Sequence, residues 1–262
     1  MSRTGIQKRT EQLEQLRQNM RRCCMSIDSI NWAIANARGP ALTFLMSLYS
    51  REAEKRETSR MANLIRNAGF PSVKSIDDYD DTELRMPASL TFEDLKSLSF
   101  IETHNSLVMH GICGSGKTML SICLGMMACN KGYKVKFYTL SQLAIRLKEA
   151  AQEKRLENML LMLRKLDLLI IDEWGYTQID SECASYIFRV IADSYEQKSL
   201  IITTNLPFSD WGRIFADEQL AAAIIDRIVH YGYSIDTGKK DWRLANSPMN
   251  GAQLVKRTST KT

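Results

Sequence analysis

The chain has 262 residues and a formal net charge of +5, from 35 Lys and Arg against 30 Asp and Glu. This length allows one α/β domain and a smaller one, and 44% hydrophobic residues support a buried core. The charge excess is too small to establish nucleic-acid binding, and six Cys without a CxxC pair argue against zinc and disulfides. No apolar run reaches the ~18 residues that span a bilayer, and the basic N-terminus lacks a signal-peptide core, so a cytoplasmic protein is expected.

The N-terminal part of the chain, residues 1–76, is predicted to be a small helical domain that interacts with a partner or with DNA. Apolar residues recur at helical spacing from Leu13 to Ile34, and the Gly39-Pro40 pair is expected to end this stretch. Two further helices are predicted over residues 41–56 and 59–68.

Residues 77–88 are predicted to be an acidic linker. Four of them are aspartates, and a run of like charges is usually a solvated segment. The chain beyond this linker, residues 89–246, carries all the motifs described below. Residues 247–262 are polar and basic and are expected to form a flexible tail.

The segment from Gly111 to Thr118 reads GlyIleCysGlySerGlyLysThr and fits the pattern G-x-x-x-x-G-K-[ST]. An apolar run precedes it and a helical pattern follows it, which is the context in which such a loop surrounds nucleotide phosphates with backbone N–H groups. Lys117 is expected to neutralise the β- and γ-phosphates of ATP, and Thr118 to bind Mg²⁺. The residues expected to contact the nucleotide are Gly111, Cys113, Gly114, Ser115, Gly116, Lys117, Thr118, Met119 and Asp172.

A second motif, AspLeuLeuIleIleAsp from Asp167 to Asp172, is followed by Glu173. Four consecutive apolar residues predict a strand that is buried on both faces, as in a parallel sheet. Its C-terminal end lies where open α/β sheets bind ligands, so Asp172 is expected to hold Mg²⁺ and Glu173 to act as general base. The alternative is a buried strand that ends in a solvated Asp-Glu pair. The phosphate loop about 55 residues earlier disfavours this alternative.

Two later segments carry further candidates. The run Ser199–Ile202 predicts a strand that leads into Thr203–Asn205, whose polar side chains could reach the γ-phosphate, although a plain strand end would look much the same. Arg227 falls in a predicted helix over residues 217–230. It is either a surface arginine or a finger that reaches the γ-phosphate bound by a neighbouring subunit.

The cations of a helical stretch between these motifs are candidate DNA contacts. Its leucines, from Leu143 to Leu163, recur at helical spacing and are expected to pack inward, which leaves the charged residues outside. On periodicity alone a solvated helix face is preferred, because nearby glutamates partly balance the charge. The cations in question are Arg146, Lys148, Lys154 and Arg155.

The fold class predicted from these elements is α/β, with a parallel sheet covered by helices. Five short strands alternate with helical patterns, and a strand that is followed by a helix and a parallel strand is the usual unit of such sheets. The predicted strands are residues 107–110, 135–139, 168–172, 200–204 and 233–236.

Several strings occur together in one order: the phosphate loop, AspLeuLeuIleIleAspGlu, IleIleThrThrAsnLeuProPheSerAspTrpGly, LeuAlaAlaAlaIleIleAspArgIle and a final AspTrpArgLeu. In this arrangement the chain, from Leu13 to Leu244, resembles the IstB family of transposition helper ATPases, relatives of the DnaC and DnaI helicase loaders. The resemblance implies an AAA+ domain without the usual C-terminal lid, preceded by a helical domain. It also implies that Asn205 is sensor 1 and Arg227 the arginine finger. By position in the chain alone, Arg213 and Arg243 compete with Arg227 for a finger or sensor role, and only the resemblance ranks them. Family members often have prolines after the first glycine of the loop, where this chain has Ile112 and Cys113.

The resemblance further implies what such a protein does. It would assemble on duplex DNA with ATP and Mg²⁺ at the interfaces of a homo-oligomer, and recruit or activate a transposase of the IstA type. It favours DNA contacts by the cations named above, with little dependence on base sequence. Two alternatives stay open: a DnaC/DnaI-like replicative helicase loader that prefers single-stranded DNA, and a nucleotide-gated binding module with little turnover. The presence of Glu173 argues against the second, since a pure switch needs no base.

Overall fold

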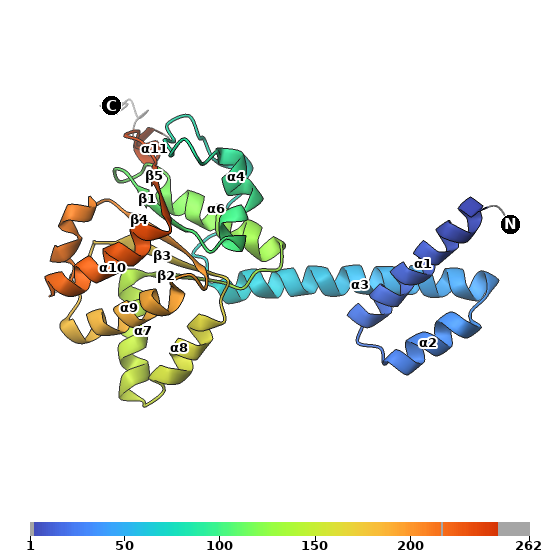
Figure 1. Cartoon of the computed structure of the whole chain (residues 1–262). Coiled ribbons are helices and arrows are strands. Elements are labelled where there is room, and N and C mark those ends of the chain that lie inside the picture. The colour runs from blue at the N-terminus through green and yellow to red at the C-terminus, as the bar shows by residue number, and fades with distance from the viewer. Residues whose placement is uncertain (1–2, 216, 246–262) are drawn as a thin grey trace, which may run out of the picture. The chain divides into compact units, whose positions relative to one another are not determined.

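The computed structural model describes residues 3–215 and 217–245 (Figure 1). The chain divides into two compact units, Met1–Asn63 and Leu64–Thr262, and each is considered by itself. The division falls within a helix and precedes the domain boundary expected after residue 76. The tail expected over residues 247–262 lies outside the described residues.

The first unit is helical. Two helices, α1 (Arg3–Arg22) and α2 (Ile27–Asn36), replace the single stretch expected from Leu13 to Ile34. The chain turns at Cys24, which has a φ of 60°, and Ser26 then caps α2 by accepting a hydrogen bond from the backbone N–H of Ser29. The buried core of the first unit consists of Leu16, Met20, Ile30 and Ala33.

The third helix, α3 (Gly39–Ala68), is one helix of 30 residues where two were expected. The Gly39-Pro40 pair begins this helix, because a proline is well tolerated in the first turn, where its missing N–H would have no intrahelical partner. Neither Gly nor Pro occurs between the two expected helices, so nothing interrupts the hydrogen-bond pattern there. The last residues of α3, from Leu64, belong to the second unit.

The second unit contains a five-stranded sheet in the order β2-β3-β4-β1-β5, and each neighbouring pair is parallel. All five predicted strands are confirmed. The central strands are buried on both faces, as their continuous apolar runs predict. The strands are β1 (Ser106–His110), β2 (Val135–Thr139), β3 (Leu168–Trp174), β4 (Ser199–Thr204) and β5 (Gly232–Asp236).

Helices cover both faces of this sheet (Figure 1). Successive side chains of a strand point to opposite faces, so Leu107 and Met109 of β1 contribute to one hydrophobic core and Val108 to the other. The first core is covered by α4 (Phe92–Ser97), α5 (Ser99–Glu102) and α6 (Lys117–Asn130). The second is covered by α7 (Leu140–Gln152), α8 (Leu156–Arg164), α9 (Ser181–Ser194) and α10 (Glu218–His230).

The segment expected to be a linker, residues 77–88, belongs to the second unit and packs onto its other elements. The backbone of Arg85 pairs with that of Asp236 in β5, through N–H to O distances of 2.8 and 2.9 Å. Tyr79 stacks on Phe92, with ring centroids 6.2 Å apart. Tyr79, Leu84 and Met86 pack against the hydrophobic core and cause this docking, and a count of charges does not reveal them.

Short elements complete the second unit. Within the described residues, only α11 (Trp242–Ala245) follows β5. Among residues 3–215 and 217–245, no helix is both long and apolar enough to cross a membrane. The two short 3₁₀ helices are η1 (Ile76–Asp78) and η2 (Phe208–Arg213).

Candidate nucleotide site

The phosphate loop lies between the end of β1 and the start of α6. Gly114 and Gly116 have φ values of 78° and 97°, a region that residues with a side chain rarely adopt. A Cβ on Gly114 would also collide with the carboxylate of Asp241. The loop leads directly into the N-terminus of α6, where free N–H groups and the helix dipole favour a phosphate.

Lys117 points back across this loop. Its Nζ donates hydrogen bonds to the carbonyl oxygens of Gly111, at 2.9 Å, and Ile112, at 2.7 Å. Burial lowers the pKa of this amine, and the nearby guanidinium of Arg243 lowers it further, while the carboxylate of Asp172 opposes the shift. A phosphate in the loop would supply the counter-charge that this buried amine lacks.

The chain after β5 contacts the loop from the other side. The hydroxyls of Ser115 and Thr237 lie 2.6 Å apart and are hydrogen-bonded, and Thr237 Oγ1 also donates to the carbonyl of His110. The backbone N–H of Trp242 donates to the carbonyl oxygen of Gly114 over 3.0 Å. The Ser115 side chain is therefore buried against the segment after β5 and ties the loop to it, and it is not among the residues that line the nucleotide pocket.

Asp172 at the end of β3 faces the start of α6. The hydroxyl of Thr118 donates to both carboxylate oxygens of Asp172, at 2.9 and 3.1 Å. Asp172 as a whole is 4% exposed. The hydroxyl of Thr203 also donates to Asp172. A carboxylate and a hydroxyl beside a phosphate loop are the oxygen ligands that Mg²⁺ takes in phosphate sites, so Thr118 and Asp172 fit this ion.

Glu173 is exposed, although the residues on both sides of it, Asp172 and Trp174, are buried. The register between β3 and β4 shifts here, and Glu173 has a φ of 59°. Its backbone N–H donates to the hydroxyl of Thr203 over 3.1 Å. This bulge turns the Glu173 side chain out of the sheet, and Glu173 lines the same pocket as Asp172.

These side chains line one pocket of about 620 Å³. Its lining includes the expected residues Cys113, Gly114, Gly116, Lys117, Thr118, Met119, Asp172 and Glu173. It also includes Thr203 and Thr204, from the strand end that was expected to reach the γ-phosphate, and Arg243, one of the late arginines considered for a finger or sensor role. The lining residues that the sequence analysis did not assign are Pro71, Ser72, Lys74, Ile122, Tyr176 and Trp242. For Thr203 and Arg243 a signal was present, since one lies in the polar end of a predicted strand and the other in the AspTrpArgLeu string.

Asn205, the expected sensor, lines a different cavity. This second cavity, of about 420 Å³, is bordered by Val108 and His110 of β1, by Phe208 and by Asp236. Thr204 lines both cavities, so the two meet at the end of β4. The structure thus brings Thr203, rather than Asn205, to the carboxylate of Asp172 and the backbone N–H of Glu173.

The late arginines lie in different surroundings. Arg227 on α10 donates to the carbonyl of Ala223 over 2.8 Å, and its guanidinium lies 4.9 Å from the centroid of the Phe188 ring. Of the described residues that line the nucleotide pocket, none is Arg227 of the same chain. Arg243, in contrast, lines that pocket from α11.

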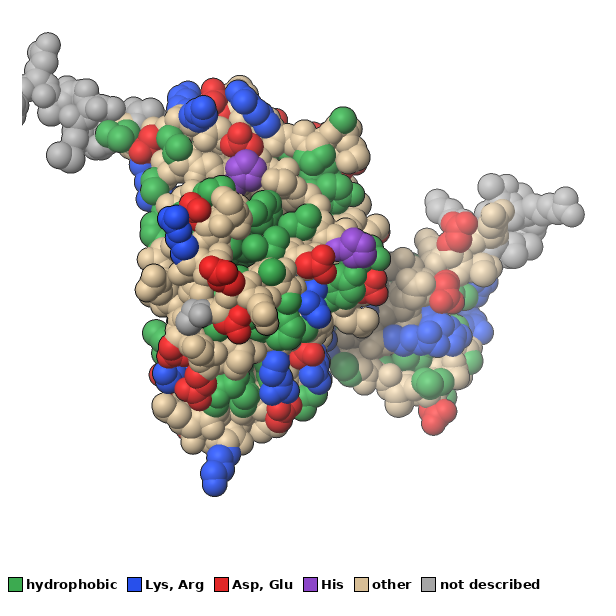
Figure 2. All heavy atoms as spheres, turned by 60° about the vertical axis from the view of Figure 1, so that its left-hand side comes forward, with side chains coloured by type: hydrophobic (Ala, Val, Ile, Leu, Met, Phe, Trp, Pro, Cys, Tyr) green, Lys and Arg blue, Asp and Glu red, His purple; other side chains and the backbone are tan. Residues whose placement is uncertain are grey.

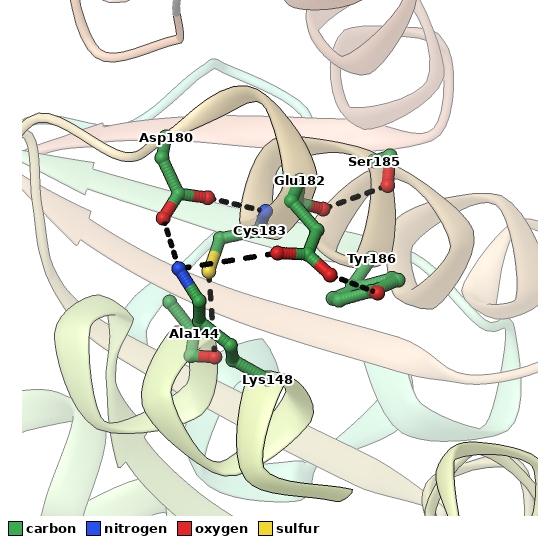
Figure 3. Close-up of polar contacts among 7 residues, drawn as sticks. All are labelled: Ala144, Lys148, Asp180, Glu182, Cys183, Ser185 and Tyr186. Carbon is green, nitrogen blue, oxygen red and sulfur yellow. Dashed lines mark hydrogen bonds and ion pairs between the residues drawn. The ribbon is translucent and has the colours of Figure 1, made fainter. Parts of the chain in front are cut away.

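The candidate DNA contacts lie on two helices, because the expected single stretch breaks at Lys154, which has a φ of 57°. Lys148 is engaged within the fold: its Nζ lies 2.7 Å from a carboxylate oxygen of Asp180 and 3.9 Å from one of Glu182 (Figure 3). Asp180 caps α9 through a hydrogen bond from Cys183, so Lys148 ties α7 to the start of α9.

The other three cations differ in exposure and partners. Arg155 forms an ion pair with Glu153, and the guanidinium of Arg146 lies 5.8 Å from the centroid of the Tyr138 ring. Lys154 is exposed at the turn between α7 and α8. On the face shown in Figure 2, Lys and Arg side chains lie among Asp and Glu side chains. On that side, the cationic surface therefore consists of single exposed Lys and Arg side chains rather than one broad basic face.

Comparison with known proteins identifies relatives over most of this length. The family model described as IstB-like ATP binding protein matches residues 15–249. A protein of insertion sequence IS5376 from Geobacillus stearothermophilus, named as ATP-binding, is 36% identical over 77% of this chain and 80% of its own length. A protein of insertion sequence IS21 from Pseudomonas aeruginosa, named in the same way, is 35% identical over 82% of this chain and 81% of its own.

Solved structures agree on the fold. The DnaI crystal structure superposes with a TM-score of 0.51 at 16% identity, over 68% of this chain and 92% of its own. AMPPCP-bound DnaA from Aquifex aeolicus gives a TM-score of 0.55 at 16% identity, over 72% of this chain and 58% of its own. The second unit therefore has the AAA+ fold with its phosphate loop. Together with the family match, this shows that the chain belongs to the IstB-like ATP-binding protein family.

Proposed function

We propose that this protein is a DNA-dependent AAA+ ATPase that serves as a helper in transposition. The observation that supports it most strongly is the pocket in which Lys117, the hydrogen-bonded pair Thr118–Asp172 and the exposed carboxylate of Glu173 converge. An amine, a divalent-cation site and a general base beside one phosphate loop are the set that hydrolysis of ATP requires.

The residues of the pocket divide the reaction among them. Lys117 exchanges its two carbonyl partners for phosphate oxygens and neutralises part of their charge. Thr118 and Asp172 hold Mg²⁺, which supplies charge neutralisation of the phosphates when it is bound. Glu173 orients a water molecule in line with the γ-phosphate and accepts its proton.

Two arginines complete the proposed machinery. Arg243 lies in the pocket of its own chain and lowers the pKa of Lys117, so it is placed to contact the same phosphates. Arg227 is engaged on α10 with Ala223 and Phe188, away from that pocket, which suits a finger that acts on a neighbouring subunit. Hydrolysis would then require assembly of a homo-oligomer with ATP at its interfaces.

DNA and a transposase are the proposed partners. Relatives are named for the insertion sequences IS5376 and IS21, which supports a role in the movement of such elements. Assembly would occur on duplex DNA through phosphate contacts, with Lys154 and Arg155 at an exposed turn as the best placed of the four candidate cations. The assembled form would recruit or activate a transposase of the IstA type.

A replicative helicase loader is the second candidate, and the similarity in fold to DnaI favours it. The two functions differ in the DNA that they require. A transposition helper of this kind would assemble on duplex DNA, whereas a loader would prefer single strands.

The test is steady-state ATP hydrolysis by the full chain, alone and with duplex or single-stranded DNA of scrambled sequence. Stimulation by duplex DNA supports the transposition helper, and stimulation by single strands alone supports the loader. A Lys117→Ala variant serves as the control for contaminating ATPases. An absence of turnover above that control under every condition contradicts the proposed ATPase.

A further inference from the structure

The junction between β3 and β4 contains one side chain that the proposed chemistry has not used. In the register of the two strands Ile171 pairs with Ile202 and Trp174 pairs with Thr204. Two residues of β3, Asp172 and Glu173, therefore stand opposite a single residue of β4, which is Thr203. This is the arrangement of a β-bulge, in which the extra residue loses its partner in the ladder.

The hydroxyl of Thr203 replaces that partner. It accepts a hydrogen bond from the backbone N–H of Glu173 over 3.1 Å and donates its own proton to the carboxylate of Asp172. A hydroxyl has one proton to donate and lone pairs to accept with, so both bonds form at the same time. Thr203 is 2% exposed.

The same hydroxyl stabilises an unusual backbone. Glu173 has a φ of 59°, which a residue with a side chain rarely adopts, and such conformations persist only where surrounding contacts hold them. Without the bond to Thr203, the N–H of Glu173 would lack a partner beside the sheet. The bulge would then relax, and the Glu173 carboxylate would leave its place next to Asp172.

We infer that Thr203 is a positioning residue for ATP hydrolysis: its hydroxyl holds the Glu173 backbone in the bulge and fixes the orientation of the Asp172 carboxylate. This role rests on the proposed ATPase function. Thr203 orients the general base and the magnesium ligand together, so its loss should slow the chemical step more than it weakens ATP binding.

The chain offers a conservative variant and a matched control. Thr203→Ser keeps the hydroxyl, whereas Thr203→Val keeps the shape and removes the hydroxyl. Ser199, at the other end of β4, is also buried, and its hydroxyl donates to the carbonyl of Phe100 over 2.9 Å. Ser199→Ala therefore removes a buried hydroxyl from the same strand, far from Glu173.

The experiment measures kcat and KM for ATP, the Kd of a fluorescent ATP analogue, and the thermal midpoint of each variant. Thr203→Val is expected to lower kcat at least about tenfold with a change in Kd below about threefold, and Thr203→Ser to restore kcat to within about threefold of the parent. Ser199→Ala should lower the thermal midpoint without changing kcat. If Thr203→Val does not fold, Thr203→Ala, which also removes the hydroxyl, is measured with the same expectation.

Contrary outcomes are distinct. A parent protein without hydrolysis would overturn the proposed function, and this inference with it. An active parent with an unchanged kcat in Thr203→Val would overturn the inference alone. A loss in Thr203→Ser as large as that in Thr203→Val would also overturn it, because the hydroxyl would then not be the group that matters.

Discussion

Lys148 of α7 donates a hydrogen bond over 2.7 Å to Asp180, the residue that caps the N-terminus of α9 (Figure 3). The bond to Lys148 lowers the pKa of Asp180 to about 2, and the same bond raises the pKa of Lys148. Asp180 also accepts a bond from the backbone N–H of Cys183. Lys148 thus joins two helices, and this sets it apart from the other three candidate DNA contacts, Arg146, Lys154 and Arg155.

The first prediction concerns DNA binding. Lys154→Ala is expected to weaken binding to duplex DNA and to reduce the salt slope by about 1, because an exposed lysine at a turn can reach a phosphate. Lys148→Ala, the matched control, should lower the thermal midpoint slightly and change DNA affinity less. The measurement is fluorescence anisotropy with labelled duplex over a series of salt concentrations. Equal losses in both variants would mean that the Lys148–Asp180 pair opens on DNA.

The second prediction is a dependence of stability on pH. Lys198 is 2% exposed, its amine donates to the carbonyl of Leu163, and burial lowers its pKa to about 8 from 10.5, with Asp193 opposing the shift and Arg164 adding to it. Between these two pKa values the unfolded state binds more protons than the folded state, so the free energy of unfolding rises with pH.

This rise is expected to be of the order of 1–3 kcal/mol between pH 8 and 10.5. It should be missing in Lys198→Met, whose loss of the bond to Leu163 lowers stability equally at each pH. Urea unfolding of the two proteins at pH 7.5, 8.5 and 9.5 measures it. Parallel curves for parent and variant would show that Lys198 keeps its proton in the folded protein.

The third prediction concerns the thiol in the phosphate loop. Cys113 is exposed, lines the nucleotide pocket, and lies 3.1 Å from the hydroxyl of Tyr176. Alkylation by N-ethylmaleimide is expected to abolish ATP hydrolysis, since the added group fills space that the phosphates need. ATP should protect against the reagent, and Cys113→Ser should be active and resistant.

The control for this experiment is Cys24→Ser, because Cys24 is the other thiol that the structure describes as exposed. This variant should remain as sensitive as the parent. Sensitivity that disappears with Cys24 instead would place the relevant thiol in the N-terminal unit.

The fourth prediction separates the two arginines. Arg227→Ala is expected to bind ATP normally and to lose hydrolysis by about 10³-fold or more, as arginine fingers do. When it is mixed with Lys117→Ala, activity should return in part, because one protomer supplies the pocket and the other the finger. Arg243→Ala lacks a side chain of its own nucleotide pocket. When it is mixed with Lys117→Ala, neither protomer has an intact pocket, so activity should not return. Turnover in the mixed oligomers is the measurement, and normal turnover by Arg227→Ala alone would refute a finger at this position.

Much of the fold could be predicted from the sequence, because the relevant signals are local. Continuous apolar runs predicted β3 and β4, and the phosphate-loop pattern predicted both the strand before it and the helix after it. The errors have physical causes as well. Gly39-Pro40 is compatible with the start of a helix as well as with the end of one, and Tyr79 docks a segment whose charges suggested a linker.

The site residues that belong to one local sequence motif could be predicted. Those whose contacts depend on the register between two strands could not. Lys117, Thr118, Asp172 and Glu173 each follow from a local pattern, and the structure places all four on one pocket. The contact of Thr203 with Glu173 depends on a bulge in the register of β3 and β4, which no local pattern reveals. Nor does a local pattern show that Asn205, assigned from the family resemblance, lines the neighbouring cavity.

The hydrogen bond between Ser115 and Thr237 has a consequence for the order of events during synthesis. The two residues are 122 positions apart, and β5, which precedes Thr237, is the last strand of the described part of the chain to leave the ribosome. Until then β1 has an unpaired edge on the side that β5 will occupy. A nascent chain therefore carries the whole phosphate loop long before the loop is closed. A message that ends before codon 237 should yield an aggregating fragment rather than a weaker ATPase.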